Sequence, residues 1–359
     1  MRRSSRQIVV ILLLVIAAAA IYFYRSRQPE PPEFTPGPIS GRLVIHFLDV
    51  GQGDAQLIQI PSGETVLIDS GDSGKPTVDL LKRFGVTKLD LVIASHPHQD
   101  HIGEMRDILR EFDVSEFWDS GFPHPTRTYR EMLQEIRGRG ITFKQARRGD
   151  TRQIGDALLE VLHPGPTFPN DENPNDASVV VRLTYGSRRF LFTGDAEIPE
   201  GQGKSSAWRQ MLDWQRDLLR ADLLKMAHHG SSNGTTAEIL DAVRPSIVTI
   251  SCAAGNDYHH PHPRVMRLLR ERDDSISVYR TDLGGTITAT TDGSTIEVSS
   301  ERQVARDLLY RTGDEVAGRE NRPASERKGP RRQCEKGRGG KERPQVSGEG
   351  LHRPYRGRC

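Results

Sequence analysis

The chain has 359 residues, 35% of them hydrophobic, so it can bury a sizeable core, most simply as one large domain with appendages. Its three cysteines are too few for a disulfide-stapled scaffold. The net charge of +2 is unevenly spread: residues 301–359 carry 16 Lys and Arg against 9 Asp and Glu, residues 1–27 carry five Arg and no acid, and residues 28–300 are acidic, at −10. An acidic domain excludes strong binding of duplex DNA through its own charge, because such affinity rests on neutralised phosphates.

The N-terminal segment predicts contact with a membrane. Residues 8–24 form 17 consecutive positions without a charge, which at ~1.5 Å per residue just span a hydrocarbon core of ~30 Å. Three arginines precede this run, so the positive-inside rule places the N-terminus in the cytoplasm. We expect residues 1–27 to be one transmembrane helix that anchors the protein, or alternatively a cleaved signal sequence, since Ala17–Ala20 offers small residues for cleavage. In both cases the catalytic part lies outside the cytoplasm, beyond a proline-rich linker at 28–40.

Residues 41–300 alternate short apolar strands with amphipathic helices, which predicts two mixed sheets with helices outside them. Strands are expected at 42–48, 55–60, 65–69, 89–94, 157–162, 178–185, 188–193, 222–227, 246–251, 276–280 and 285–290. Helices are expected near 76–84, 103–112, 127–138, 205–220, 235–243 and 263–272. After residue 300 the apolar periodicity fades, so residues 301–359 are expected to be a basic, largely disordered tail.

The apolar strand at 89–94 ends in four side chains that commonly bind metal ions: His96, His98, Asp100 and His101. His96 and His98 lie two positions apart, so in an extended chain they point the same way. Imidazoles and a carboxylate at a strand-to-helix turn suit zinc, manganese or iron, and two neighbouring pairs suit two ions. The loop is therefore the strongest candidate site in the chain.

Other strand ends also carry polar side chains. Asp69 ends the apolar strand at 65–69, where a buried carboxylate is costly unless it meets donors or metal-bound groups. Asp195 follows the strand at 188–193, where its carboxylate could either bind a metal ion or cap a helix. His228 and His229 follow the strand at 222–227.

These motifs, in the order FLDVGQGDA, IDSG, HPHQDHIGE, FLFTGDAE and LLKMAHHGSS, resemble the metallo-β-lactamase superfamily. Over about 42–298 the chain resembles the hydrolase domain of ComEC-type competence proteins. The resemblance implies a four-layer αββα sandwich of the α/β (α+β) class and a cofactor of two divalent ions, Zn or Mn. The ligands that it implies are His96, His98, Asp100, His101, Asp195, which would bridge the two ions, and His229.

The chain departs from the superfamily at one ligand. Many members have a histidine shortly before the strand that precedes Gly-Asp, but here that position falls near 173–176, where there is none. His163 lies farther upstream, at the end of another strand. The first metal site would then have only His96, His98 and Asp195, or would use an asparagine or aspartate in addition.

The expected activity is metal-dependent hydrolysis in which metal-bound hydroxide attacks a phosphodiester, with Asp100 essential for turnover. His228, with His260 or His262, could stabilise a phosphoryl oxygen or protonate the leaving group. The resemblance implies a nuclease. Because the acidic stretch disfavours duplex DNA, a small or single-stranded substrate such as single-stranded DNA, a phosphorylated lipid and a cell-wall component are the open choices. The alternatives are hydrolysis of another ester, a thioester, a lactone or a lactam, and a degenerate metal-binding sensor.

Overall fold

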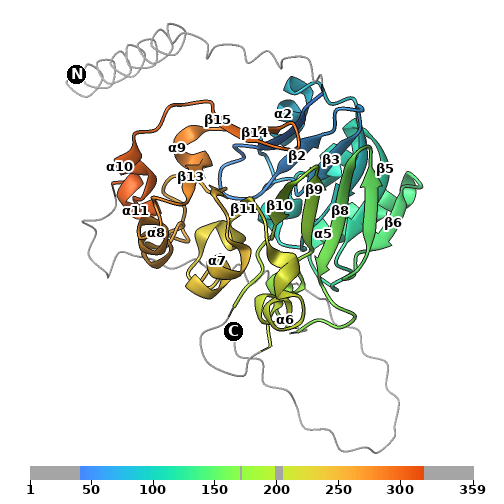
Figure 1. Cartoon of the computed structure of the whole chain (residues 1–359). Coiled ribbons are helices and arrows are strands. Elements are labelled where there is room, and N and C mark those ends of the chain that lie inside the picture. The colour runs from blue at the N-terminus through green and yellow to red at the C-terminus, as the bar shows by residue number, and fades with distance from the viewer. Residues whose placement is uncertain (1–40, 170–171, 199–204, 319–359) are drawn as a thin grey trace, which may run out of the picture.

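The computed structural model describes residues 41–169, 172–198 and 205–318, and Figure 1 shows two stacked sheets with helices on their outer faces. The expected transmembrane segment at 8–24 and the linker at 28–40 lie outside these ranges. Within them, no helix is long and apolar enough to cross a bilayer.

The first sheet has eight strands, antiparallel on one side and parallel on the other. Their order is β15 (Ile296–Ser300), β14 (Ile287–Thr291), β1 (Leu43–Phe47), β2 (Gln56–Gln59), β3 (Thr65–Ile68), β4 (Lys88–Ile93), β5 (Asp113–Asp119) and β6 (Thr142–Gln145). The strands from β3 to β6 are parallel, so their carboxyl ends lie at the same edge.

The second sheet has seven strands. Their order is β13 (Ser277–Arg280), β12 (Ile247–Ile250), β11 (Leu223–Lys225), β10 (Arg188–Phe192), β9 (Val180–Tyr185), β8 (Ala157–His163) and β7 (Thr151–Ile154). Here β10 to β13 are parallel and the others antiparallel. The two parallel halves supply the strand ends that carry the site.

Successive side chains along a strand point to opposite faces of the sheet. Because the inner strands are apolar at successive positions, each sheet is apolar on both faces. In β3, Val66 and Ile68 belong to the core between the sheets, whereas Leu67 packs under the helices. Across the central core, the rings of Phe47 and Phe192 stack at 6.2 Å.

The helices form two outer layers. Those over the first sheet are α2 (Thr77–Arg83), α4 (Met105–Glu111) and α5 (Arg127–Gly138), with the short α3 (Gln99–Ile102) in the ligand loop. Those over the second are α6 (Ala207–Trp214), α7 (Ala237–Val243) and α8 (Pro263–Arg270). The short helices η1 (Pro174–Ala177), η2 (Arg216–Leu219), η3 (Ala227–Gly230), α9 (Thr281–Gly284), α10 (Arg306–Leu309) and α11 (Gly313–Val316) complete the described elements. The expected four-layer sandwich is confirmed.

Each expected strand and helix recurs, but the structure adds β5, β6, β7 and β15. Three of these, β6, β7 and β15, are edge strands. Edge strands present one side to solvent and carry polar residues there, which weakens the apolar signal in the sequence. β5 was missed although it lies inside the first sheet, since only its second half is continuously buried.

The boundary expected at residue 300 is wrong. The chain continues through α10 and α11, which lie beside α8 and α9 (Figure 1). The buried Arg280 donates to the backbone carbonyls of Leu309 and Arg311 and pairs with Asp282. These contacts are polar, so they leave no apolar periodicity in the sequence; residues 319–359 lie outside the described residues.

Candidate metal centre

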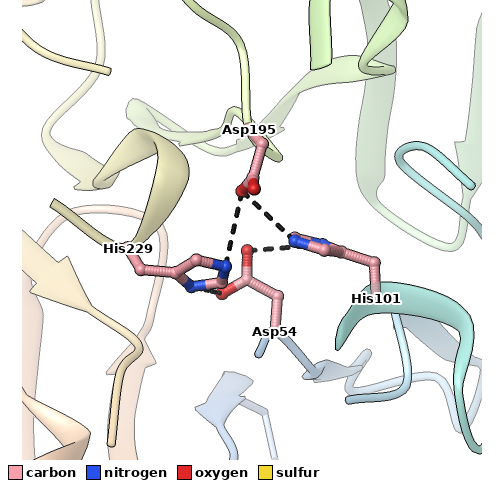
Figure 2. Close-up of side chains that lie close together, drawn as sticks. All are labelled: Asp54, His101, Asp195 and His229. Carbon is pink, nitrogen blue, oxygen red and sulfur yellow. Dashed lines mark ion pairs between the residues drawn. The ribbon is translucent and has the colours of Figure 1, made fainter. Parts of the chain in front are cut away.

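Four buried side chains from four separate segments meet at the strand ends (Figure 2): Asp54, His101, Asp195 and His229. One ligand atom from each lies within 4.8 Å of all the others. Asp54 follows the glycine turn between β1 and β2 and was not among the ligands expected from the sequence. The other three come from α3 and from the ends of β10 and β11, as expected.

His101 and His229 both present Nε2 to this centre. The Nδ1 of His101 donates to Asp69 Oδ2 at 2.8 Å, and the Nδ1 of His229 donates to the carbonyl of Ser251 at 2.9 Å. Both Nε2 atoms are buried and have no hydrogen-bond partner among the described residues, and the same is true of Asp195 Oδ1. Buried polar atoms without partners are costly, so this donor set fits a divalent cation.

Asp69 holds the ligand loop from behind. Besides His101, it accepts hydrogen bonds from the backbone N–H and the hydroxyl of Ser95, each at 2.7 Å. Its φ of 60° lies in the left-handed region, which is strained for an aspartate. These hydrogen-bond donors are what a buried carboxylate at the end of this strand was expected to need.

His96 and His98 form a second group of donors beside the first. Nε2 of His96 lies 3.0 Å from Nδ1 of His98 and 3.9 Å from Asp195 Oδ2. Asp195 therefore faces both groups, since its other oxygen lies 3.2 Å from His101 Nε2. Asp195 caps none of the helices found in residues 41–169, 172–198 and 205–318, and its contacts are with the histidines of the centre.

Asn175 occupies the cleft where the superfamily histidine is missing. Its Nδ2 donates to Glu197 Oε1 at 2.6 Å, whereas its Oδ1 is buried without a hydrogen-bond partner among the described residues. His163 does not line the cleft, and its Nδ1 donates to the carbonyl of Ser178 at 2.8 Å. The expectation that an asparagine or aspartate stands in is consistent with this geometry.

Asp100 lies at the open side of the centre, with Oδ2 at 3.3 Å from Nε2 of His229. Burial alone would raise the pKa of Asp100, but His101 and His229 outweigh it and hold that pKa below its usual range. In the same way, burial would lower the pKa of His101, but Asp195, Asp69 and Asp100 raise it well above its ordinary value. Asp100 and His101 thus stabilise each other's charged forms.

Lys225 is the second site residue that the sequence analysis missed. It is fully buried at the end of β11, and its ammonium pairs with Asp54 and lies 3.4 Å from the carbonyl of Gly194. A lysine inside the apolar run Leu223–Met226 was the available signal, because lysine is almost never fully buried unless paired.

The centre opens into a cleft of about 280 Å³ that includes His228, Tyr258 and His260 in its lining. His228 Nδ1 lies 3.1 Å from Glu197 Oε1, and its Nε2 lies 3.6 Å from Asp195 Oδ2. Burial acts to lower the pKa of His228, but Asp195 and Glu197 raise it overall.

The sequence analysis left His260 and His262 as alternatives, and the structure separates them. His260 lines the cleft, where burial and the nearby His229 and His228 lower its pKa to about 3. His262 instead caps α8, accepting from the backbone N–H of Arg264 at 3.2 Å.

A sandwich with such a centre at its strand ends defines a class of metal-dependent hydrolases. Residues 48–254 match the family described as the metallo-beta-lactamase superfamily, and the chain belongs to it.

The narrower resemblance to ComEC-type hydrolase domains is also confirmed. ComE operon protein 3 of Bacillus subtilis is 31% identical over 269 residues, covering 69% of this chain and 33% of that protein. Recombination protein 2 of Haemophilus influenzae is 30% identical over 239 residues, covering 65% of this chain and 27% of that protein. The chain thus spans about a third of the length of these relatives. Among solved structures, the diiron β-hydroxylase CmlA of Streptomyces venezuelae is 17% identical with a TM-score of 0.47, covering 68% of this chain and 53% of that chain.

Proposed function

We propose that the chain is a metal-dependent phosphodiesterase whose substrate is nucleic acid. The observation that carries this proposal is the convergence, at the base of an open cleft, of buried ring nitrogens and carboxylate oxygens that have no hydrogen-bond partner in the part of the chain that the structure describes. Bound divalent ions would lower the pKa of a water toward ~7 and offset the charge of a phosphate.

Two groups of side chains would hold the ions. His96 and His98 form the first group with Asn175, His101 and His229 form the second with Asp100 and Asp54, and Asp195 faces both. Imidazole nitrogens suit zinc and carboxylate oxygens suit manganese, so this mixed set fits either ion.

The remaining cleft residues suit a phosphodiester. His228 and His260 lie with their rings 5.4 Å apart. His228, whose pKa is raised, can protonate the leaving oxygen, and the neutral ring of His260 can donate a hydrogen bond to a phosphoryl oxygen. Tyr258 is 49% exposed and stacks on His260 with ring centroids 5.8 Å apart, so one face can receive a base or sugar. The names of the competence and recombination relatives support a nucleic-acid substrate.

A single strand suits the cleft better than a duplex. The stretch 28–300 has a net charge of −10, so the protein supplies little charge of its own for duplex phosphates. The run at 8–24, which lies outside the described residues, supports a membrane-anchored protein whose catalytic domain is extracytoplasmic.

The test is an assay of the full chain in detergent, with Mn²⁺ or Zn²⁺, against bis-p-nitrophenyl phosphate, single-stranded DNA and nitrocefin. We expect both phosphodiesters to be cleaved and nitrocefin to survive. Asp100→Ala should reduce cleavage by about 10²-fold or more, because Asp100 contacts His229 at the open side of the centre.

The matched control is His262→Asn, which keeps a good helix cap outside the cleft and should retain activity. Bound metal in the purified protein without cleavage of any substrate would identify a degenerate metal-binding sensor instead of an enzyme. Turnover of nitrocefin alone, or full phosphodiesterase activity in Asp100→Ala, would contradict the proposal.

A further inference from the structure

A series of aromatic and cationic side chains leads away from the cleft toward the end of α6. We call it the aromatic band, and it consists of His124, Phe122, Phe168, Arg147, Arg148 and Trp214. None of these residues lines the cleft, and none was assigned a role above.

The band begins at the metal-ligand loop. The ring of His124 lies 5.9 Å from the ring of His98, edge to face. Two positions earlier in the same loop, the buried Phe122 packs against Phe168, with ring centroids 5.2 Å apart. Phe122 therefore anchors the loop, while Phe168 is partly exposed.

The outer part of the band alternates guanidinium groups with aromatic rings. Arg147 lies over the ring of Phe168 at 5.4 Å, and Arg148 lies over the ring of Trp214 at 4.9 Å. Trp214 nevertheless stays 61% exposed at the end of α6, so much of the indole is free to meet a ligand.

The two guanidinium groups of the band form no ion pair within the described ranges of the chain. Arg147 donates to the carbonyls of Ser120 and Ala146, and neither Arg147 nor Arg148 pairs with a carboxylate there. By contrast, Arg182 and Arg188 in the second sheet each have a carboxylate partner. Unpaired guanidinium groups in an acidic stretch mark a place where a polyanion can bind.

We infer that the aromatic band binds a single-stranded polynucleotide as it leaves the cleft, with bases stacked on Trp214 and Phe168 and phosphates paired with Arg147 and Arg148. Base stacking on exposed aromatic rings beside cationic groups is the usual mode for single strands, whereas a duplex keeps its bases paired. The inference rests on the proposed function, because it extends the same substrate beyond the cleft. It explains how a stretch, residues 28–300, of net charge −10 holds a polyanion without a broad basic surface.

Trp214 makes the inference directly measurable. The other two tryptophans of the chain, Trp118 and Trp208, are buried at 1% and 0% exposure. Quenching of intrinsic fluorescence by acrylamide in the full chain therefore reports mainly on Trp214. We expect oligo(dT) of about 20 nucleotides, added with EDTA to prevent cleavage, to protect this fluorescence, and a duplex of that length to protect it far less.

The variants are Trp214→Ala and Arg148→Glu, each with a matched control. Phe143→Ala removes another aromatic ring, 40% exposed on the edge strand β6, and Arg189→Glu reverses another exposed charge, at the opposite end of β10 from the site. Fluorescence anisotropy of labelled oligo(dT) should show dissociation constants raised about tenfold in the two band variants, with the controls within about twofold of the wild type. Hydrolysis of bis-p-nitrophenyl phosphate should be unchanged in all four, because that substrate is too small to reach the band.

The outcomes are distinguishable. Unchanged oligo(dT) binding in Trp214→Ala and Arg148→Glu, with normal hydrolysis of the small ester, would overturn the band and leave the proposed function intact. Protection of Trp214 by oligo(dT), lost in Arg148→Glu, would support the band even if no phosphodiester were cleaved, and the proposed function would then be the part that failed. Protection that grows with protein concentration in the absence of DNA would identify the surface as a contact between two copies of this chain, and would overturn the inference.

Discussion

His101 and His229 turn the same ring nitrogen, Nε2, toward the centre because Nδ1 of each is already bonded, to Asp69 and to the carbonyl of Ser251. The direction of a ligand is thus set by residues that do not reach the ion. Lys225 acts similarly on Asp54: its ammonium occupies Oδ2, and only Oδ1 remains free for a cation. A buried ion pair is costly to form, so its presence beside the centre favours a role in setting local charge over one in stability.

His46 leads to a prediction about pH and stability away from the centre. Its Nδ1 bonds Thr288 and its Nε2 bonds Gln59, and burial lowers its pKa to about 4. The unfolded chain binds a proton at this histidine near pH 6.5, whereas the folded chain does so only near pH 4. The contribution of His46 is therefore fully present above pH 6.5 and is lost as the pH falls to 4, by about 3 kcal/mol.

The measurement is the free energy of unfolding, from urea titrations of the full chain with EDTA, between pH 7 and pH 4. His46→Gln keeps polar contacts to its neighbours and should show a shallower fall in stability than the wild type. The buried His163, whose pKa is also lowered to about 4, should leave a residual slope in both proteins. Parallel curves for the two proteins would refute this account of His46.

At the scale of elements, the segment after β15 holds the loop that carries Tyr258 and His260. Asp314 Oδ1 lies 2.7 Å from His259 Nδ1, and the backbone N–H of Gly313 donates to the carbonyl of Pro261 at 3.3 Å. A Cβ at Gly313 would clash with the carbonyl of His260, so the contact requires glycine. One wall of the cleft is thus held from outside by α11.

We predict that a chain ending at residue 318 has the melting temperature of the full chain, whereas one ending at residue 300 melts well below it. The shorter chain removes two carbonyl acceptors from the buried Arg280, at a cost of about 3 kcal/mol for hydrogen bonds to a charged group. Differential scanning fluorimetry of the two truncations measures the effect. Equal melting temperatures would mean that the segment after β15 contributes no stability.

At the scale of the whole molecule, the charge distribution and the apolar run at 8–24 bear on where the domain works. The basic flank, the apolar run and the proline-rich linker precede an acidic domain in that order. This order of features is the sequence observation behind the proposed membrane anchor.

The corresponding prediction concerns topology. Alkaline phosphatase fused after residue 318 should be active in cells, because that enzyme folds only outside the cytoplasm. A fluorescent protein that matures only in the cytoplasm should stay dark at the same position. The reverse pattern would place the domain in the cytoplasm and remove any role on external polymers.

The sequence by itself determined the fold class and most of the candidate ligands, because those signals are local. The strand before His96 ends in a continuous apolar run, and His96, His98, Asp100 and His101 lie within six positions. The strand and the ligand cluster could therefore both be predicted without knowledge of distant contacts.

Only the tertiary structure decided which polar side chains meet. Asp54 and Lys225 are 171 positions apart and become neighbours only when the two sheets stack. The tertiary structure also places Asn175 in the cleft. It places His260 in the cleft and His262 at the start of α8, although the two lie only two positions apart. The edge strands are held by backbone pairing, and the segment after residue 300 is held in part by carbonyl groups that accept from Arg280. Backbone contacts of this kind leave no pattern in the sequence, since every residue carries the same N–H and C=O groups.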